Sequence, residues 1–508
     1  MHPGGHGPTT GAWLLVAAVL ALLVLGCWWF WTRPVTAMIA VLNAPDATIV
    51  SCDRTGTGTL GLSDLRPGVY PVTIQRVGYA PLNTDIVVKR FGANRLDVAL
   101  DALPWTLRVT APEGAACRVT DGSGAQVATG TGSIDTHLGA GRYVVEVSSA
   151  GKNPYRRELF LDQDTALTVR LDAEGQLVHS LGIIPCAGAP KGVVVTPNGR
   201  EAWATILNGP PSIEIFDVAT LARLGGIDIG EYGAVEIVFS ADGSRAYASQ
   251  METAKVFEID TATRTVLREL PTESAWTKVV SLSPDGATLF AANWSGDDVS
   301  EIDLASGKVR RRIRTADTPR GLWQTPDGKT LYVAGFEGGE LQRIDLASGE
   351  VTTVFDSGGA LRHLVADAGR GMLFASDMSK DVVWVHELAT GTTRTFCETD
   401  EKPNTIDLSP DGKVLFVSCR GENNPKSYYI PGFEWGTILL IDTTDGTPLD
   451  AIIGGNQCTA LDVSDDGKTL VFSDFLDDRL QVYEIPDYDT LTSGGGGRWE
   501  QHFTDLRK

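Results

Sequence analysis

The sequence predicts an all-β protein: a seven-bladed β-propeller preceded by two small β-sandwich modules and one N-terminal transmembrane helix. Three features of the 508 residues lead to this prediction. An uncharged apolar run lies near the N-terminus, two stretches of short strand-like runs follow, and a turn motif then recurs seven times at a period typical of propeller blades. We place the boundaries at residues 1–34 for the tail and anchor, 35–102 and 103–173 for the modules, 174–486 for the propeller, and 487–508 for a flexible C-terminal tail.

The apolar run covers residues 12–31, AWLLVAAVLALLVLGCWWFW, and its 20 residues carry no charge. A helix of that length crosses the hydrocarbon core of a bilayer. Trp28, Trp29 and Trp31 cluster at its far end, as interfacial aromatic residues do. We therefore expect an uncleaved membrane anchor. Two alternatives stay open: a signal peptide cleaved near residues 35–37, and a lipoprotein, because residues 24–27 loosely resemble a lipobox.

The two modules follow one plan. In the first, strand-like runs at residues 47–50, 69–74 and 85–88 are separated by turn residues such as Gly78. In the second, GRYVV at residues 141–145 matches GVYPV at residues 68–72, and PEGA stands at residues 112–115. Both copies resemble PEGA-type modules, the second more divergently. That resemblance implies a spacer or an envelope-binding adaptor.

The repeat that follows has a conserved internal order. Each copy has a tight turn ending in glycine, a β-branched or aromatic strand, a third strand that often ends in Ile-Asp, a further turn, and a fourth strand. Most copies are 41 to 44 residues apart, and the last spacing is 55. One such sheet cannot bury both of its faces, so the sheets must stack radially. The seven turn glycines are Gly199, Gly243, Gly286, Gly328, Gly369 (in a degenerate copy), Gly412 and Gly467.

Closure of the ring can also be predicted. The seventh repeat has three strands and ends near Ile485, whereas residues 177–184 form a strand-like segment without a blade of its own. We expect this segment to be the fourth strand of the last blade. Over residues 177–485 the repeats resemble the YVTN family of propellers. That resemblance implies a secreted or surface protein, and the placement of the chain outside the cytoplasm rests on it.

One face of the propeller is the predicted ligand mouth. The aligned position about eight residues before each turn glycine is cationic in four of the seven repeats, in a chain whose net charge is -21. Such a ring would attract anions. The alternative is that these side chains pair with neighbouring carboxylates or face solvent. The seven aligned residues are Lys191, Val235, Lys278, Arg320, Arg362, Asn404 and Thr459.

An insertion of about a dozen residues in the sixth repeat should rise from the same face. It spans residues 420–436 and is rich in aromatic side chains, so it either supplies binding anchors or merely caps the channel. From it we add Arg420, Tyr428, Tyr429 and Trp435 to the candidate ligand-binding residues Lys191, Lys278, Arg320, Arg362 and Asn404.

The cysteines and histidines point to no metal or haem site. The seven cysteines include no closely spaced pair. Cys419 and Cys458 should lie in adjacent blades, as two thiols or, alternatively, as a disulfide. The seven histidines are scattered, and only His363 falls near the predicted mouth. We expect no cofactor, and the negative net charge disfavours nucleic acid as a partner.

These observations favour a binding protein over an enzyme, since the chain has no GxSxG, HExxH or P-loop motif. We expect a membrane-anchored, extracytoplasmic binding or scaffold protein that recognises a protein or anionic glycan partner in the cell envelope. One alternative is a metal-assisted, lactonase-like hydrolase that would use Glu236, Asn293, Asn404 and Asp474. The other is a purely structural envelope protein.

Overall fold

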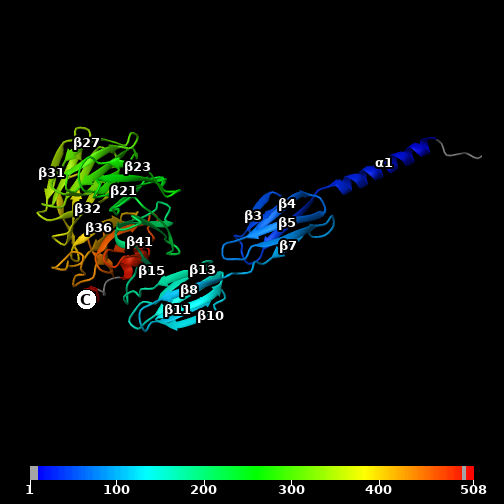
Figure 1. Cartoon of the computed structure of the whole chain (residues 1–508), viewed down its shortest axis with the longest axis horizontal. Coiled ribbons are helices and arrows are strands. Elements are labelled where there is room, and N and C mark those ends of the chain that lie inside the picture. The colour runs from blue at the N-terminus through cyan, green and yellow to red at the C-terminus, as the bar shows by residue number, and fades with distance from the viewer. Residues whose placement is uncertain (1–9, 495–498) are drawn as a thin grey trace, which may run out of the picture.

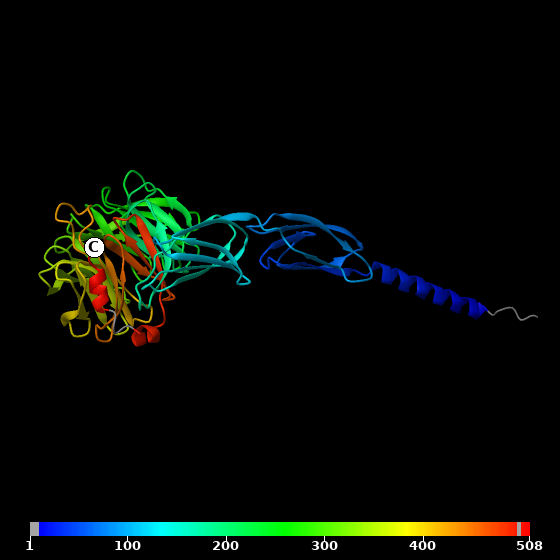
Figure 2. The ribbon, with the colours of Figure 1, turned by 90° about the horizontal axis from the view of Figure 1, so that it is seen from below.

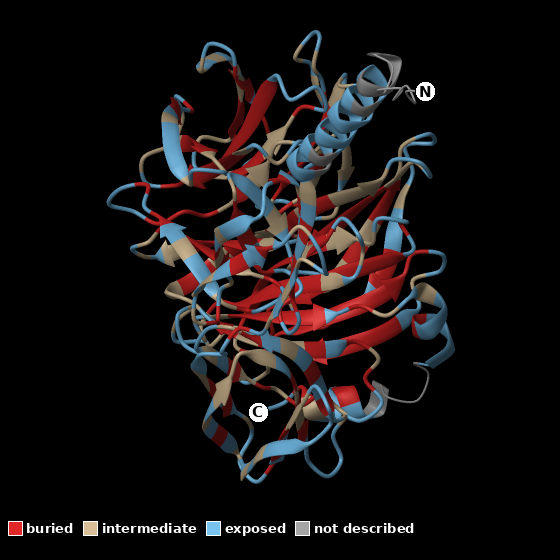
Figure 3. Ribbon diagram, turned by 90° about the vertical axis from the view of Figure 1, so that its right-hand side faces the viewer, coloured by how far each residue is buried: buried red, intermediate tan, exposed pale blue. Residues whose placement is uncertain are grey.

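The computed structural model describes residues 10–494 and 499–508. Its parts lie in a line, with helix α1 at one end, two β modules in the middle and a propeller-like ring of sheets at the other end (Figures 1 and 2). The strands of the ring are largely buried, whereas α1 is exposed (Figure 3). The whole is an all-β protein in which four-stranded sheets repeat.

Helix α1 spans Thr10–Thr32. At its end the Arg33 guanidinium lies 3.4 Å from the centre of the Trp29 ring. Within the described part of the chain, no helix combines the length and apolar character required to span a membrane. The anchor stays a prediction, and the part of the tail at residues 1–9 lies outside the described residues.

The first module is one seven-stranded sheet in the order β6-β5-β2-β3-β4-β1-β7. It curls around a core that includes Ile39, Ile49, Ile74 and Ile86. The short strand β3 pairs with both β2 and β4 and so joins the two halves of the curled sheet, β6-β5-β2 and β4-β1-β7. The strands are β1 (Val35–Val41), β2 (Thr48–Ser51), β3 (Arg54–Thr57), β4 (Thr59–Leu65), β5 (Gly68–Gln75), β6 (Leu82–Val88) and β7 (Arg95–Val98).

The second module has two separate layers, β10-β9-β12-β13 and β11-β8-β14, around a core of its own. The first module packs against it: Trp105 Nε1 donates to the Gly78 carbonyl at 3.3 Å, and a Cβ at Gly78 would lie 2.6 Å from Cβ of Asp162. The strands are β8 (Pro104–Thr110), β9 (Ala116–Asp121), β10 (Gln126–Thr131), β11 (Ser133–Gly139), β12 (Gly141–Ser148), β13 (Tyr155–Leu161) and β14 (Thr165–Thr168).

The ring contains six complete four-stranded sheets, each antiparallel and in chain order. Their strands are β16 (Gly188–Val195), β17 (Glu201–Asn208), β18 (Ile213–Asp217) and β19 (Arg223–Ile227); β20 (Ile237–Phe239), β21 (Arg245–Gln250), β22 (Lys255–Asp260) and β23 (Thr265–Pro271); β24 (Thr277–Leu282), β25 (Thr288–Asn293), β26 (Asp298–Asp303) and β27 (Lys308–Arg314); β28 (Pro319–Gln324), β29 (Thr330–Gly335), β30 (Glu340–Asp345) and β31 (Val351–Asp356); β32 (Leu361–Asp367), β33 (Met372–Asp377), β34 (Val382–Glu387) and β35 (Thr393–Glu398); β36 (Pro403–Leu408), β37 (Val414–Cys419), β38 (Thr437–Asp442) and β39 (Pro448–Ile453).

The seventh sheet closes the ring as the sequence predicts. Strands β40 (Cys458–Val463), β41 (Thr469–Asp474) and β42 (Arg479–Glu484) are completed by β15 (His179–Pro185), which pairs antiparallel with β42. First strands of neighbouring sheets contact one another in the order β16, β20, β24, β28, β32, β36, β40 and back to β16. In addition, β14 pairs with β15, so the last sheet continues into the second module. The ring and that module are therefore joined by shared backbone pairing.

The turn motif has the predicted conformation. In the second repeat Gly243 has φ +69°, and its N–H donates to the Ser240 carbonyl at 2.8 Å. The Asp242 carboxylate accepts hydrogen bonds from both Ser240 and Ser244, which lower its pKa to about 2. In the degenerate fifth repeat the glycine with positive φ is Gly371 and not Gly369.

The C-terminal segment differs from the flexible tail that the sequence predicts. It contains helices α2 (Tyr488–Gly494) and α3 (Trp499–Asp505). Leu491 packs into the core of the sixth and seventh sheets, and buried His502 lies with Nε2 2.9 Å from Oδ2 of Asp400. Tertiary contacts order these short helices, whereas the glycines of the run at residues 495–497 lie outside the described residues.

Candidate functional site

The candidate site is built from the starts of the first strands, where the backbone is irregular. In six sheets the pairing of the first two strands is shifted at this point, and β20, which follows Val235, lacks the shift. Such bulges re-aim a side chain and are common next to functional sites. The aligned residues at the shifts are Lys191, Lys278, Arg320, Arg362, Asn404 and Thr459.

A second local feature marks the same places. Five of the aligned residues stand two positions after a non-glycine residue in the left-handed region of φ, a conformation that stores strain. The strained residues are Ala189, Trp276, Thr318, Lys402 and Gln457, with φ of 59°, 57°, 53°, 60° and 62°. The fold therefore holds this edge of the sheets in a conformation that side-chain propensity alone would not select.

The structure places five cationic side chains close enough for the charge of one to change the pKa of another. Each of them lowers the pKa of at least one other member of the group, or has its own pKa lowered by one. The five are Lys191, Lys278, Arg320, Arg362 and Arg420. The guanidinium residues are buried, with 3%, 6% and 6% of Arg320, Arg362 and Arg420 exposed. We call these five residues the central cation cluster.

Glu236 is the carboxylate whose charge acts on this cluster. It favours the charged forms of Lys191, Arg320 and Arg362, while burial raises its own pKa. One carboxylate does not neutralise five cations. Burial, followed by the charges of Arg320, Lys191 and Arg362, consequently lowers the pKa of Lys278 to about 5.

Two arginines of the cluster, and Asn404 at the aligned position of the sixth sheet, carry polar atoms that no described residue satisfies. Arg320 Nη1, Arg420 Nε and both side-chain polar atoms of Asn404 are buried without a hydrogen-bond partner among residues 10–494 and 499–508. Leaving a buried donor unpaired costs about 1–3 kcal/mol, and more for a charged group. Three of these atoms, Arg320 Nη1, Arg420 Nε and Asn404 Nδ2, are hydrogen-bond donors, and together with the excess positive charge they would suit an anion.

The insertion loop covers the cluster with Tyr428. Lys191 Nζ donates to Tyr428 Oη at 3.0 Å, and the Arg420 guanidinium lies 4.3 Å from the centre of the Tyr428 ring. Gln457 holds this tyrosine in place by donating from Nε2 to its carbonyl at 2.7 Å. Tyr429 packs edge-on against Tyr428 and is 62% exposed. Tyr428 therefore lies beside the cations, as the sequence predicts, whereas Tyr429 contacts the rings of Tyr428 and Phe475.

Trp435 lies elsewhere. Its backbone N–H donates to the Leu506 carbonyl at 3.0 Å, and Lys508 Nζ lies 4.5 Å from the centre of its indole ring. It lines a cavity of about 350 Å³ together with Arg170 of the second module. The C-terminal segment holds this half of the loop against the outer part of the ring, so the structure does not bring Trp435 together with the cluster.

Asn293 and Asp474 of the predicted hydrolase site make internal contacts, whereas the side-chain polar atoms of Asn404 make none among the described residues. Asn293 donates to Asp298 at 2.7 Å and to Ser300 at 2.8 Å, and Asp474 accepts from Gln481 at 2.7 Å and from Arg479 at 2.6 Å. Cys419 and Cys458 are buried free thiols and form no disulfide.

Sequence reasoning missed an aromatic layer beside the cations. Trp294, Phe336 and Phe475 directly follow the second strands of their sheets, at the aligned position that Arg420 occupies in the sixth. Lys278 Nζ lies 3.5 Å from the centre of the Trp294 ring, and Lys191 Nζ lies 4.7 Å from that of Phe475. Aligning the repeats at this second position would have revealed the layer.

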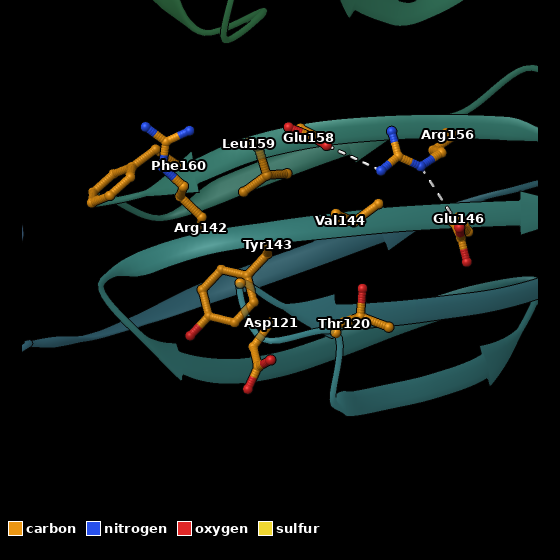
Figure 4. A pocket seen from close by; sticks show the side chains of 12 residues that line it. Thr120, Asp121, Arg142, Tyr143, Val144, Glu146, Arg156, Glu158, Leu159 and Phe160 are labelled. Atoms are coloured by element: carbon orange, nitrogen blue, oxygen red, sulfur yellow. Dashed lines mark hydrogen bonds and ion pairs between the residues drawn. The ribbon is translucent and has the colours of Figure 1, made fainter.

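A different hollow lies on the second module, with a volume of about 480 Å³ (Figure 4). Arg142, Tyr143 and Phe160 line part of it. Arg156 contacts both Glu146 and Glu158, at 3.9 and 3.0 Å. These exposed pairs balance charge within the hollow, unlike the central cation cluster.

Comparison with known proteins gives a relative and a fold. No family model matches the sequence. The chain is 34% identical over 326 residues to antigen Lp49 of Leptospira interrogans, an alignment that covers 62% of this chain and 71% of that protein. Among solved structures, Kuenenia stuttgartiensis hydrazine synthase matches with a TM-score of 0.51 and 18% identity, over 58% of this chain and 96% of that chain. At that identity the likeness concerns the propeller-like fold alone.

Proposed function

Because the chain belongs to the same family as antigen Lp49 of Leptospira interrogans, we propose that it is a membrane-anchored, extracytoplasmic binding protein. Its ring, a seven-bladed propeller of YVTN type, holds an anionic group of a glycan or protein partner of the cell envelope. The relative's name, antigen, supports a location outside the cytoplasm. The YVTN and PEGA-like assignments rest on the repeat and strand motifs of the sequence.

The observation that carries this proposal is the central cation cluster. Glu236 is the described carboxylate whose charge acts on Lys191, Arg320 and Arg362. Arg320 Nη1, Arg420 Nε and Asn404 Nδ2 have no hydrogen-bond partner among the described residues. A carboxylate or phosphate group would supply both the missing charge and the missing acceptors. The rest of the chain is acidic, so attraction of anions is confined to this centre.

The anchor is supported by the 20 uncharged residues at 12–31 and by exposed apolar side chains on α1, such as Leu14 and Leu22, which are 72% and 68% exposed. The two modules then act as a spacer between the bilayer and the ring. Their end-to-end arrangement supports this role (Figure 2).

Binding of small probes tests the anion site. Calorimetric titration should show that glucuronate binds and that glucose, its neutral counterpart, does not. Arg320→Met should raise the Kd by about tenfold or more, because it removes a charge-assisted hydrogen bond. Acetyl-aspartate serves as the probe for a protein carboxylate, and the tighter of the two anions indicates the source of the partner group.

Lys329→Met is the matched control, since Lys329 belongs to the same sheet and its side chain is 80% exposed. It should leave the Kd within about twofold. Equal binding of glucose and glucuronate would refute the proposal, and so would an Arg320→Met protein that binds like the unmodified one. If neither glucuronate nor acetyl-aspartate binds, the anion site is refuted, and the alternative of a purely structural envelope protein is favoured.

A further inference from the structure

Lys278 differs from the other lysine of the central cation cluster. It is the second residue of β24 and is half-buried, with Nζ stacked 3.5 Å from the centre of the Trp294 ring. Lys191 Nζ donates to Tyr428, whereas Lys278 Nζ has neither a hydrogen bond nor an ion pair among the residues that the structure describes. The amine of Lys278 therefore has no polar partner among the described residues that it would have to give up in order to react.

The surroundings of Lys278 favour an unprotonated amine. In a buried group of like charges the guanidinium ions keep their protons, because their ordinary pKa exceeds about 12, and a lysine gives up its own first. Burial and the charge of Arg320 lower the pKa of Lys278 to about 5. At pH 7 an ordinary lysine is neutral in only about 1 of 2,500 molecules. Such an environment makes a lysine nucleophilic.

We propose that Lys278 forms an imine with an anionic carbonyl compound, a 2-oxo acid or an aldehyde acid, whose carboxylate is held by Arg320 and Arg362. This inference rests on the proposed anion site and specifies its ligand. The amine nitrogen attacks the carbonyl carbon and a C–N bond forms. The carbonyl oxygen leaves as water with the two amine hydrogens, so nothing is oxidised or reduced, and water reverses the step.

Reductive trapping tests the proposal. The full chain is incubated with glyoxylate and sodium cyanoborohydride, and the modified lysines are identified by peptide mass spectrometry. Lys278 should be the main site, modified at pH 7 at least about tenfold faster than exposed Lys329. The rate at Lys278 should be nearly flat between pH 6 and 8, because a pKa of about 5 leaves its amine mostly unprotonated over this range. Propionaldehyde, which lacks the carboxylate, should react with Lys278 more slowly than glyoxylate.

Two variants make the test specific. Arg320→Met should abolish the preference for glyoxylate and shift the pH profile of Lys278 upward, because it removes both the carboxylate ligand and the main charge acting on the amine. Lys329→Met should change neither. Equal rates at Lys278 and surface lysines would overturn the inference. If Lys278 is unreactive in a protein that still binds glucuronate, imine formation is overturned and the anion site stands. If the protein neither reacts at Lys278 nor binds glucuronate, the anion site is overturned as well.

Discussion

At the scale of the residue, position decides the chemistry of identical side chains. Asp242, in an exposed turn, accepts hydrogen bonds from Ser240 and Ser244 that lower its pKa to about 2. Asp407, on the first strand of the sixth sheet, has its pKa raised to about 6 by burial. The sequence motif predicts the first environment because the turn is local. It does not predict the second, which depends on the neighbouring sheets.

Asp407 and Asp462 connect the sheets that close the ring. Asp407 Oδ2 accepts from the Val463 N–H at 2.9 Å, and Asp462 Oδ2 accepts from the Val195 N–H at 2.7 Å. Each carboxylate thereby reaches the next sheet. Burial and the charge of Asp407 also raise the pKa of Asp462 well above its ordinary value.

This pair predicts a pH dependence of stability. Because the pKa of Asp407 is higher in the folded state, its contribution is fully present below about pH 4 and is lost as pH rises through about 6. Asp407→Asn should therefore gain free energy of unfolding relative to the unmodified protein between pH 5 and pH 8, by about 1–2 kcal/mol. Urea titrations at the two pH values measure this change.

Asp411→Asn is the control for that experiment. Asp411 lies in the turn of the same repeat, and its pKa is lowered, with Ser409 among its hydrogen-bond donors. Its effect on stability should be the same at pH 5 and pH 8, since the residue is ionised at both. An Asp407→Asn effect that is equally flat would show that this carboxylate does not titrate in the predicted range.

At the scale of the element, the insertion loop is divided between two environments. The sequence predicts that its aromatic side chains share one rim, and Tyr428 lies beside the cations as expected, with Tyr429 packed against it. Trp435 contacts the C-terminal segment instead. That segment was predicted to be flexible because it is short and glycine-rich, and α3 depends on contacts such as that of His502 with Asp400, which are remote in sequence.

The C-terminal segment should restrain the loop. In addition to the contact of Trp435, the backbone N–H of Lys508 donates to the Phe433 carbonyl at 3.1 Å. Glu434 and Arg507 form an isolated antiparallel β-bridge through their backbones. Ending the chain after residue 498 should release the loop, so that trypsin cleaves after exposed Lys426 at least about tenfold faster. Timed digestion with mass spectrometry measures the rate. Phe503→Ala, at a 58% exposed position of α3, should leave it unchanged. Equal cleavage of the shortened and full chains would mean that the segment does not hold the loop.

At the scale of the whole molecule, an acidic chain encloses a cationic centre. Counting strands in the sequence is enough to predict the closure of the ring through residues 177–184, because each repeat must complete four strands. The pairing of β14 with β15 could not be predicted in the same way, since the repeat pattern ends at the ring and the contact is a single pair, Thr168 with Ile183. The alignment of repeats gives the cations but not their unpaired donors, which depend on side-chain geometry.

The central claim is that an anion binds the unpaired donors of Arg320 and Arg420, in the central cation cluster, together with that of Asn404 at the aligned position of the sixth sheet. Anomalous diffraction from crystals grown with selenate, a dianion with a strong selenium signal, tests it most directly. A selenium peak should lie within hydrogen-bond distance of Arg320 Nη1, Arg420 Nε and Asn404 Nδ2, and it should vanish in Arg320→Met. Donors satisfied by ordered water, with selenium bound only at surface residues such as Lys329, would contradict the account.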